Sequence, residues 1–321
     1  MTSELYQAQS TGTWNGGPNV PGDFTFTPGA NSVGLREYVY SLNGGNTVTV
    51  PVGTGTATVV SIAPPKDGSN VLSVQARNTA GIASVPTYYY FLVRPSEGSW
   101  NWTMDEGVGA IAKSEPENTR PAQFSATGVT WNPAAKVGAA AVTLDGAGQL
   151  TTASPVLDTT KVSGFTVAAW GRPTDLTGNR TMVSQSGANR SMFQLGLRTD
   201  VDLNGDAQPE TAWCFSITRT DSQDAGVDAA CTTNYVAADT WVSLVGIYDP
   251  AIGTAKLYVN GTPDFGGAYA EAVMTNAAWA APGPFSIGSA RCADRWIGDL
   301  DHVYARQDRW NDEDILSFAV Y

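Results

Sequence analysis

Charged side chains are scarce in this chain, and this and other absences exclude several classes of protein. Only 15% of the 321 residues are charged, whereas roughly a quarter is usual in a globular domain. The 18 lysines and arginines form no cluster and the net charge is −12, which argues against nucleic acid and anionic membranes as partners. No apolar run reaches the roughly eighteen residues of a transmembrane helix, so we expect no membrane insertion.

Histidine is nearly absent, which limits acid–base chemistry. The single histidine, His302, lies in a predicted strand, and a lone strand histidine is more often a packing or surface residue than the base that a serine or cysteine nucleophile needs. Sugar hydrolysis needs two carboxylates across a cleft, and no strand carries acids in a pattern such as E-x-D-x-x-E. We therefore expect a protein that is not an enzyme.

Cysteine is also rare, and zinc ligands are too few for a convincing zinc site. Cys214 and Cys231 flank a hairpin-like segment, so a disulfide is predicted there, with two buried thiols as the alternative. A disulfide would place the protein in an oxidising compartment, secreted or at the cell surface. Cys292 is left over and is expected to be free and half-buried.

Almost the entire sequence has the pattern of short strands separated by turn residues. The regular spacing in the first part indicates a small antiparallel sandwich, and the second part has longer strands of mixed alternating and continuous apolar character, which is typical of a two-sheet body. Asn311, followed three residues later by Asp314 and then by apolar residues, predicts a short C-terminal helix. The expected strands are FTFTP, LREYVYSL, TVTVPV, TATVVSI, NVLSVQARN and TYYYFLV, and then AAVTLDG, GFTVAAWGRP, RTMVSQSG, MFQLGLRT, AWCFSITR, WVSLVGIYD, TAKLYVNGT, PFSIG and DLDHVYAR.

The predicted organisation is a linker over residues 1–21, a first domain over 22–95 and a second over 99–321. The stretch TGTWNGGPNVPG has the composition of a linker, and the first ten residues lack the charged-then-apolar layout of a signal peptide. The composition is nevertheless typical of extracellular proteins. We expect a piece of a longer exported bacterial protein, with further domains of that chain as neighbours.

The order of segments in the second domain carries a resemblance. WTMDEGVGAIA, GAAAVTLDGAG, FTVAAWGRPTD, WVSLVGIYDPAIGTAKLYVNG, FSIGSA and GDLDHVYARQDRWNDEDI together resemble bacterial laminin-G-like domains of the concanavalin A-like jelly-roll superfamily. NVLSVQARNTAGIAS in the first domain resembles bacterial immunoglobulin-like or fibronectin type III-like modules. The resemblance implies an all-β chain with an immunoglobulin-like sandwich followed by a jelly roll, in which a concave face binds glycans or proteins.

Residues 199–210, TDVDLNGDAQPE, place Asp200, Asp202, Asn204 and Asp206 at alternate positions around Gly205. Calcium takes about six to eight oxygens from a flexible loop, and these residues match the first half of an EF-hand-type loop. The twelfth position is threonine instead of glutamate, and strands replace the flanking helices. A structural Ca²⁺ ion held by the four side chains and an ordinary polar hairpin tip both remain open.

The resemblance implies a second cation site. In related jelly rolls an ion ties the first segment of the domain to its last strand, and Asp105 and Asp301 fall at the corresponding places. Lys113 lies where the family often has an aspartate, which departs from the pattern. An ion at either site would be structural, because it would clamp loops that are otherwise poorly ordered.

Sugar-binding side chains are expected in loops of the second domain, because aromatic faces stack on sugars and polar groups bind their hydroxyls. Trp279 is the candidate for an exposed aromatic side chain, and Asn179, Arg180 and Asp224 are candidates for the rim of a site. Trp296 is instead expected to be packed in the core.

The sequence thus predicts a non-catalytic, calcium-stabilised segment that recognises a glycan or a cell-surface protein. Two alternatives remain open. One is a purely structural stalk or scaffold module of a larger surface or toxin-delivery protein, and the other is a glycan-active enzyme on a jelly-roll fold.

Overall fold

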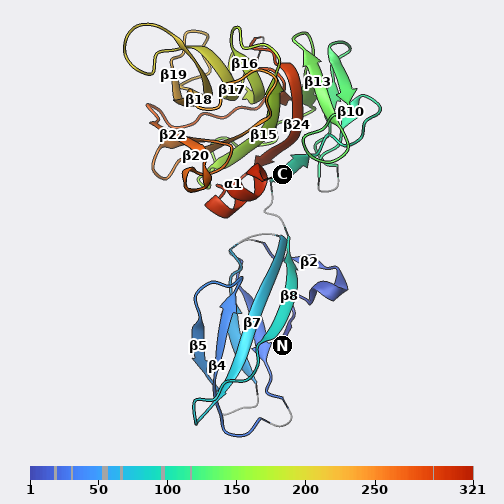
Figure 1. Ribbon diagram of the computed structural model, residues 1–321, viewed down its shortest axis with the longest axis vertical. Helices are drawn as coiled ribbons and strands as arrows, with labels where there is room; N and C mark the ends of the chain where they lie inside the picture. The colour runs from blue at the N-terminus through green and yellow to red at the C-terminus, as the bar shows by residue number, and fades with distance from the viewer. Residues whose placement is uncertain are drawn as a thin grey trace. The chain divides into compact units, whose positions relative to one another are not determined.

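The computed structural model describes residues 1–17, 20–29, 32–52, 57–65, 68–94, 98–115, 118–291 and 293–320. The chain divides into two units, residues 1–97 and 98–321 (Figure 1). Both consist of β-strands, and the described part of the chain has one α-helix, of eight residues, which confirms the all-β class. No helix in these ranges is long and apolar enough to cross a bilayer. Cys292 and Pro95, the predicted end of the first domain, lie outside the described residues.

The first unit is a sandwich of a three-stranded sheet, in the order β1-β3-β6, and a five-stranded sheet, in the order β2-β8-β7-β4-β5. Phe24 and Phe26 from the smaller sheet pack against Tyr38, Leu72 and Phe91 from the larger one. The predicted strands of this unit are confirmed, while its immunoglobulin-like relationship stays a prediction. The elements are β1 (Thr2–Ser3), a 3₁₀ turn η1 (Gln9–Thr11), β2 (Trp14–Asn15), β3 (Gly22–Phe26), β4 (Leu35–Leu42), β5 (Val48–Pro51), β6 (Thr58–Ile62), β7 (Gly68–Asn78) and β8 (Thr87–Val93).

The first residues belong to this sandwich, so the predicted linker over residues 1–21 is wrong. β1 pairs with β3 and β2 pairs with β8. Between them Tyr6 is fully buried, with its ring centroid 5.3 Å from that of Phe91, and its hydroxyl donates to the Val20 carbonyl at 2.6 Å. A Cβ at Gly16 would lie 2.5 Å from the Tyr6 ring. The glycine that suggested a flexible linker therefore makes room for a core tyrosine.

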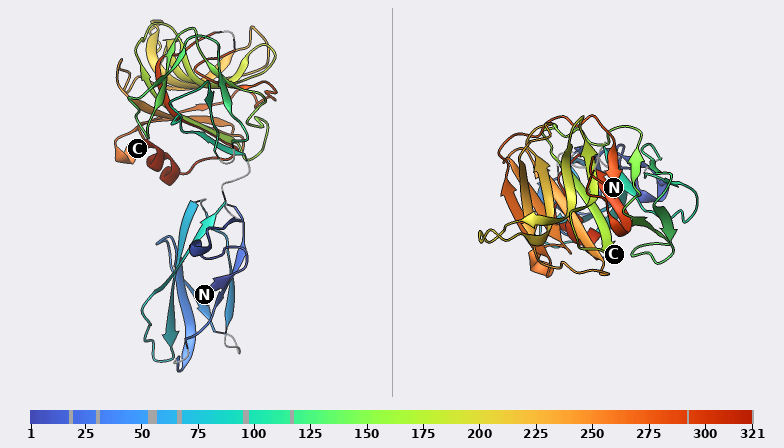
Figure 2. Two further views of the ribbon diagram at one scale, coloured as in Figure 1. Left: turned by 90° about the vertical axis from the view of Figure 1, so that its right-hand side faces the viewer. Right: turned by 90° about the horizontal axis from the view of Figure 1, so that it is seen from above.

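The second unit is a larger sandwich whose two sheets lie face to face (Figure 1, Figure 2). The sheet in the order β10-β11-β14-β23-β16-β17-β18-β19 is called the polar-faced sheet here, and the sheet in the order β12-β13-β24-β15-β20-β21-β22, with β9 paired to β24, is called the helix-covered sheet. The strands are β9 (Ser99–Trp102), β10 (Ile111–Ala112), β11 (Ala122–Phe124), β12 (Val129–Asn132), β13 (Ala141–Asp145), β14 (Leu150–Thr152), β15 (Phe165–Pro173), β16 (Arg180–Ser186), β17 (Ser191–Val201), β18 (Glu210–Thr218), β19 (Val227–Thr232), β20 (Val242–Asp249), β21 (Thr254–Val259), β22 (Ala268–Val273), β23 (Phe285–Ile287) and β24 (Ile297–Arg306), with a 3₁₀ turn η2 (Pro263–Phe265).

The predicted C-terminal helix is present as α1 (Asp312–Ala319). The Asn311 side chain accepts from the Asp314 amide at 3.0 Å, and the Asp314 carboxylate accepts from the Asn311 amide at 3.2 Å, which forms the predicted capping box. Ile315 and Phe318 are buried against Trp170 on the outer face of the helix-covered sheet. The helix therefore occupies one outer face of the sandwich and leaves the outer face of the polar-faced sheet for other roles.

The burial of Tyr6 generates a prediction about the stability of the first unit. Tyr6→Ala should lower the free energy of unfolding of this unit by about 3 to 5 kcal/mol, as expected for removal of a buried aromatic side chain. Amide hydrogen exchange in β3 and β8 of the full chain measures the stability of this unit separately from that of the second unit. Gln7→Ala, at an exposed neighbouring position, is the control and should change the free energy of unfolding by less than about 0.5 kcal/mol. Equal exchange in the two variants would mean that residues 1–17 do not support the sandwich.

Candidate functional site

Polar side chains cross the outer face of the polar-faced sheet from strand to strand. On β17 and β18 the alternation of a half-buried sheet directs Leu195 and Phe215 into the core, so their neighbours Gln194 and Ser216 face outward. These two residues are cross-strand partners, and Gln194 is also the partner of Ser184. The same register continues the row over further strands. In order, the row comprises Gln123, Thr151, Ser286, Ser184, Gln194 and Ser216.

A small hollow, called the depression below, opens beside this row. It is a shallow surface hollow between β16, β17 and β18, with about 150 Å³ of empty space that includes open solvent. Gly196 lets β16 and β17 approach closely beside it, because a Cβ there would lie 2.1 Å from the Arg180 carbonyl oxygen. The disulfide between Cys214 and Cys231 joins β18 to β19 at this place, as predicted. The lining residues are Arg180, Thr181, Gln194, Gly196, Leu197, Arg198, Cys214 and Ser216.

Two buried polar atoms of residues that line the depression have no hydrogen-bond partner among the described residues. They are the Oγ of Ser216, whose residue is 2% exposed, and the Nε of Arg180. A buried polar group without a partner costs about 1 to 3 kcal/mol. A hydroxyl-bearing ligand that reaches these atoms would remove that cost, so the depression has the chemistry of a polar binding site.

Ion pairs fix the arginines of the depression. Arg198 binds both carboxylate oxygens of Asp200, at 2.8 and 2.7 Å, and this contact lowers the pKa of Asp200. Arg180 pairs with Asp175, and hydrogen bonds from Thr177 together with this pair lower the pKa of Asp175 to about 2. Both carboxylates therefore stay ionised at neutral pH.

Of the four predicted ligand-binding residues, the structure places two beside the depression. Arg180 lines it, and the Asn179 side chain accepts from the Thr199 amide at 2.9 Å and donates to Asp200 at 3.2 Å. Asp224 is exposed in the loop between β18 and β19 and is not among the lining residues.

Trp279, predicted as the exposed aromatic side chain, is half-buried against the core instead. Its indole N–H donates to the Thr218 carbonyl at 2.7 Å, and its ring fills the space above Gly187, where a Cβ would lie 2.4 Å away. The expectation failed because a tryptophan in a loop can still pack inward. Trp296 is fully buried, as predicted.

Gln194 and Ser216 were not identified from the sequence. The available signal was weak, since each is a polar residue at an alternate position of an otherwise apolar predicted strand, MFQLGLRT or AWCFSITR. Polar outward residues are normal on half-buried strands. Only the cross-strand register shows that the two lie side by side.

The acidic hairpin between β17 and β18 gathers a different set of ligands from the one predicted. One carboxylate oxygen each of Asp202, Asp206 and Glu210 lies within 4.8 Å of the others. Asp200 is not in this group, because Arg198 holds its carboxylate, and the side-chain oxygen of Asn204 accepts from the Asp206 amide. Asp200 and Asn204 as ligands therefore stay predictions.

Asp105 and Asp301, the second predicted pair, come together around one turn. β9 pairs with β24, so the segment after β9 lies beside the strand that carries Asp301. Asp301 Oδ2 accepts from the amides of Lys136 and Val137, each at 2.9 Å, and Asp105 Oδ1 accepts from those of Ala139 and Ala140. Asp301 is fully buried, and its Oδ1 has no hydrogen-bond partner among the described residues. Carboxylate oxygens of this kind fit a hard cation such as Ca²⁺.

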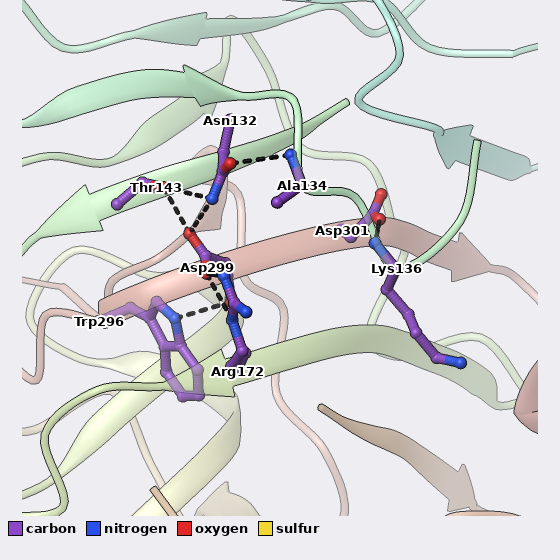
Figure 3. Close-up of polar contacts among 8 residues, drawn as sticks. All are labelled: Asn132, Ala134, Lys136, Thr143, Arg172, Trp296, Asp299 and Asp301. Atoms are coloured by element: carbon purple, nitrogen blue, oxygen red, sulfur yellow. Dashed lines mark hydrogen bonds and ion pairs between the residues drawn. The ribbon is translucent and has the colours of Figure 1, made fainter. Parts of the chain in front are cut away.

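Asp299, the neighbouring acid on the same strand, has several hydrogen-bond partners for its carboxylate. Asp299 accepts from Arg172 Nε at 2.7 Å and from Asn132 at 2.9 Å, and it also bonds Thr143 (Figure 3). Its backbone carbonyl accepts from the indole N–H of Trp296. This buried ion pair was not predicted from the sequence. It leaves Asp301 as the acid on this strand whose carboxylate is only partly used.

His302 follows Asp301 at a β-bulge, where its φ is 49° and the register between β15 and β24 shifts by one residue. Its ring packs near Tyr304 and Phe318 at 5.4 and 6.3 Å, and burial lowers its pKa. These contacts fit the packing role that the sequence suggested.

The environment of Asp301 generates a prediction about pH. Burial raises the pKa of Asp301 from 3.8 to about 7, with a smaller contribution from the charge of Asp105. The folded state then binds this proton more tightly than the unfolded state, so the stability contributed by Asp301 is full below pH 3.8 and is lost as pH rises towards about 7. In buffer with a chelator, Asp301→Asn should flatten this fall in Tm and should be the more stable protein at pH 8.

The other groups that face Asp301 are Asp105, His302 and Lys136, and all three remain in the variant. Burial of His302 lowers its pKa and therefore changes stability in the opposite direction, but this contribution cancels when the variant is compared with the wild type. Parallel curves of Tm against pH for the two proteins would show that Asp301 does not titrate in this range.

The chain is similar in fold to several solved structures. Domain 4 of AbnA, a GH43 extracellular arabinanase from Geobacillus stearothermophilus in complex with arabinotriose, is 14% identical with a TM-score of 0.51, over 68% of this chain and 97% of that one. The botulinum neurotoxin type G receptor-binding domain is 12% identical with a TM-score of 0.45, over 69% of this chain and 50% of that one. The Ruminococcus gnavus IT-sialidase CBM40 bound to α2,3-sialyllactose is 10% identical with a TM-score of 0.39, over 56% of this chain and 96% of that one. At these identities the likeness concerns the fold alone.

No curated protein sequence matches the chain. The family model described as the concanavalin A-like lectin/glucanases superfamily matches residues 144–315. This segment is more than half of the 321 residues and lies within the second unit. The chain therefore belongs to the concanavalin A-like lectin/glucanase superfamily.

Proposed function

We propose that the second unit is a non-catalytic recognition domain that binds a glycan at the depression. The observation that carries this proposal is the pair of unpartnered polar atoms, Ser216 Oγ and Arg180 Nε, at a hollow beside the polar cross-strand row. Sugar hydroxyls both donate and accept, so they match such mixed donors and acceptors. The arabinanase domain with a similar fold was solved with arabinotriose, which makes arabino-oligosaccharides a sensible first probe.

The carboxylates near the depression support a role without catalysis. None of its eight lining residues is Asp or Glu, and the two nearest acids described above, Asp175 and Asp200, are paired with arginines. Their lowered pKa values keep them ionised, so neither has the proton that a general acid must donate at neutral pH. The disulfide supports an oxidising location outside the cell.

A scaffold role is the second candidate, and one observation favours it. The depression is a shallow hollow whose 150 Å³ of empty space includes open solvent, whereas a typical small-molecule site is a cleft of roughly 300 to 1,000 Å³. A face filled by its own side chains suits a stalk module that only connects other domains. Binding measurements decide between the two roles.

Glycan binding generates the following prediction. The full chain should bind at least one glycan on an array, and Gln194→Ala should weaken that binding about tenfold or more in calorimetry, because an amide that bonds sugar hydroxyls is lost. Gln208→Ala, at an exposed hairpin position, is the matched control and should bind like the wild type. A failure to bind any glycan would favour the scaffold role, and equal binding by both variants would place the ligand elsewhere.

We further propose that calcium stabilises this unit through the turn held by Asp105 and Asp301, with a weaker contribution from the acidic hairpin. At the turn, a cation would neutralise two neighbouring carboxylates and bond the unpartnered Oδ1 of Asp301. In the hairpin the acids already accept hydrogen bonds from backbone amides. The Gly205 amide, for example, donates to Asp202 at 2.7 Å. They also remain exposed to water, so an ion there gains less.

Calcium at millimolar concentration should therefore raise the Tm of the full chain at pH 8. Asp301→Asn should abolish most of the rise, the double variant Asp202→Asn/Asp206→Asn should reduce it slightly, and Asp224→Asn, which alters an exposed acid outside both groups, should leave it unchanged. If the Tm of the wild type does not respond to calcium, both groups are only turns.

A further inference from the structure

We infer that the first unit carries its own binding surface for a neutral glycan chain, formed by Trp14, Tyr88 and Tyr90. These three side chains are called the aromatic row. They lie on the outer face of the five-stranded sheet, away from the core of the first unit. The inference is independent of the depression in the second unit and of calcium.

The alternation of β8 creates most of the row. Tyr89, Phe91 and Val93 face the core, so Tyr88 and Tyr90 face outward. Tyr88 is 57% exposed and Tyr90 is 53% exposed, whereas Phe91, the next residue along the strand, is fully buried. The sequence TYYYFLV thus places two large aromatic side chains in solvent on one strand.

Trp14 extends the row at the end of the strand. β2 pairs in parallel with β8 and sets Trp14 opposite Leu92, and the two strands lie side by side in Figure 1. Leu92 is two residues beyond Tyr90 and shares its outward face, and partners in register project to the same face. Trp14 is 44% exposed. The aromatic row therefore follows β8 over about 14 Å, from the spacing of roughly 3.4 Å per strand residue.

The residues directly opposite the two tyrosines are uncharged. Ser73 lies opposite Tyr88 and Val71 lies opposite Tyr90 on the neighbouring strand β7, and Ser41 follows beyond Ser73 on β4. Charged side chains of this sheet lie further along the strands, where Glu37 contacts Arg77 at 2.8 Å and Arg36 at 3.5 Å. Such a face suits a ligand that is uncharged, apolar on the faces of its rings and rich in hydroxyls at their edges, as a neutral sugar chain is.

The size of the row argues against a second copy of the chain as the occupant. Each aromatic side chain offers about 150 to 250 Å² in all, and about half of this is exposed, which gives on the order of 300 Å² for the row. A stable protein interface needs roughly 800 Å² from each partner. Two copies of the full chain, each with a net charge of −12, would also repel each other.

The test uses affinity electrophoresis of the full chain in gels that contain a soluble neutral polysaccharide, with arabinan, xylan and hydroxyethyl cellulose as the panel. At least one of these should retard the wild type, and polygalacturonate should not. Tyr88→Ala/Tyr90→Ala should weaken the interaction roughly tenfold or more through the loss of two stacking contacts. Tyr88→Phe/Tyr90→Phe should retain it, because stacking does not need the hydroxyl groups.

Two controls separate this surface from others. Phe265→Ala removes an aromatic side chain that is 74% exposed in the second unit and should leave retardation unchanged, as should Gln208→Ala at an exposed hairpin position. The absence of retardation by every neutral polysaccharide, or equal retardation of the Tyr88→Ala/Tyr90→Ala variant, would overturn the inference. A concentration-dependent dimer in sedimentation that Trp14→Ala abolishes would assign the row to a second copy instead.

Discussion

Burial of the inward sheet faces is the constraint on which the second unit depends. Aromatic rings from both sheets meet between the layers, as with Phe165 and Phe193, whose centroids are 5.0 Å apart, and Trp102 and Phe285, which are 5.2 Å apart. Because side chains alternate along a strand, every residue committed to this core leaves its neighbour on an outer face. The core therefore determines which side chains are available for recognition.

The two outer faces have been used differently. α1 covers one of them with Ile315 and Phe318, and the acids of β24 lie on that same sheet, where Asp299 binds the half-buried Arg172 and Asp301 binds the turn after β12. The other face keeps a row of small polar residues and the depression. In the first unit the same alternation, without a covering helix among the described residues, leaves Tyr88 and Tyr90 in solvent. Both proposed recognition surfaces thus lie on sheet faces that no α-helix covers among the described residues.

Local patterns allowed the strands, the disulfide and the capped helix to be predicted, because each depends on residues close in sequence or on a hairpin. The failures involve contacts over long distances or competition between partners. The burial of Tyr6 needs Phe91 from the far end of the unit, the carboxylate of Asp200 contacts Arg198, and the ring of Trp279 fills the space above Gly187. The depression required the register of three strands, which the sequence does not specify.

The central claim is that recognition in the second unit takes place on the outer face of the polar-faced sheet. The most direct measurement is mapping of amide chemical shifts of the full chain while the best glycan from the array is added. The account predicts changes that centre on the outward residues of β16, β17 and β18, around Gln194 and Ser216. Changes confined to the side of α1, or to loops remote from these strands, would contradict it.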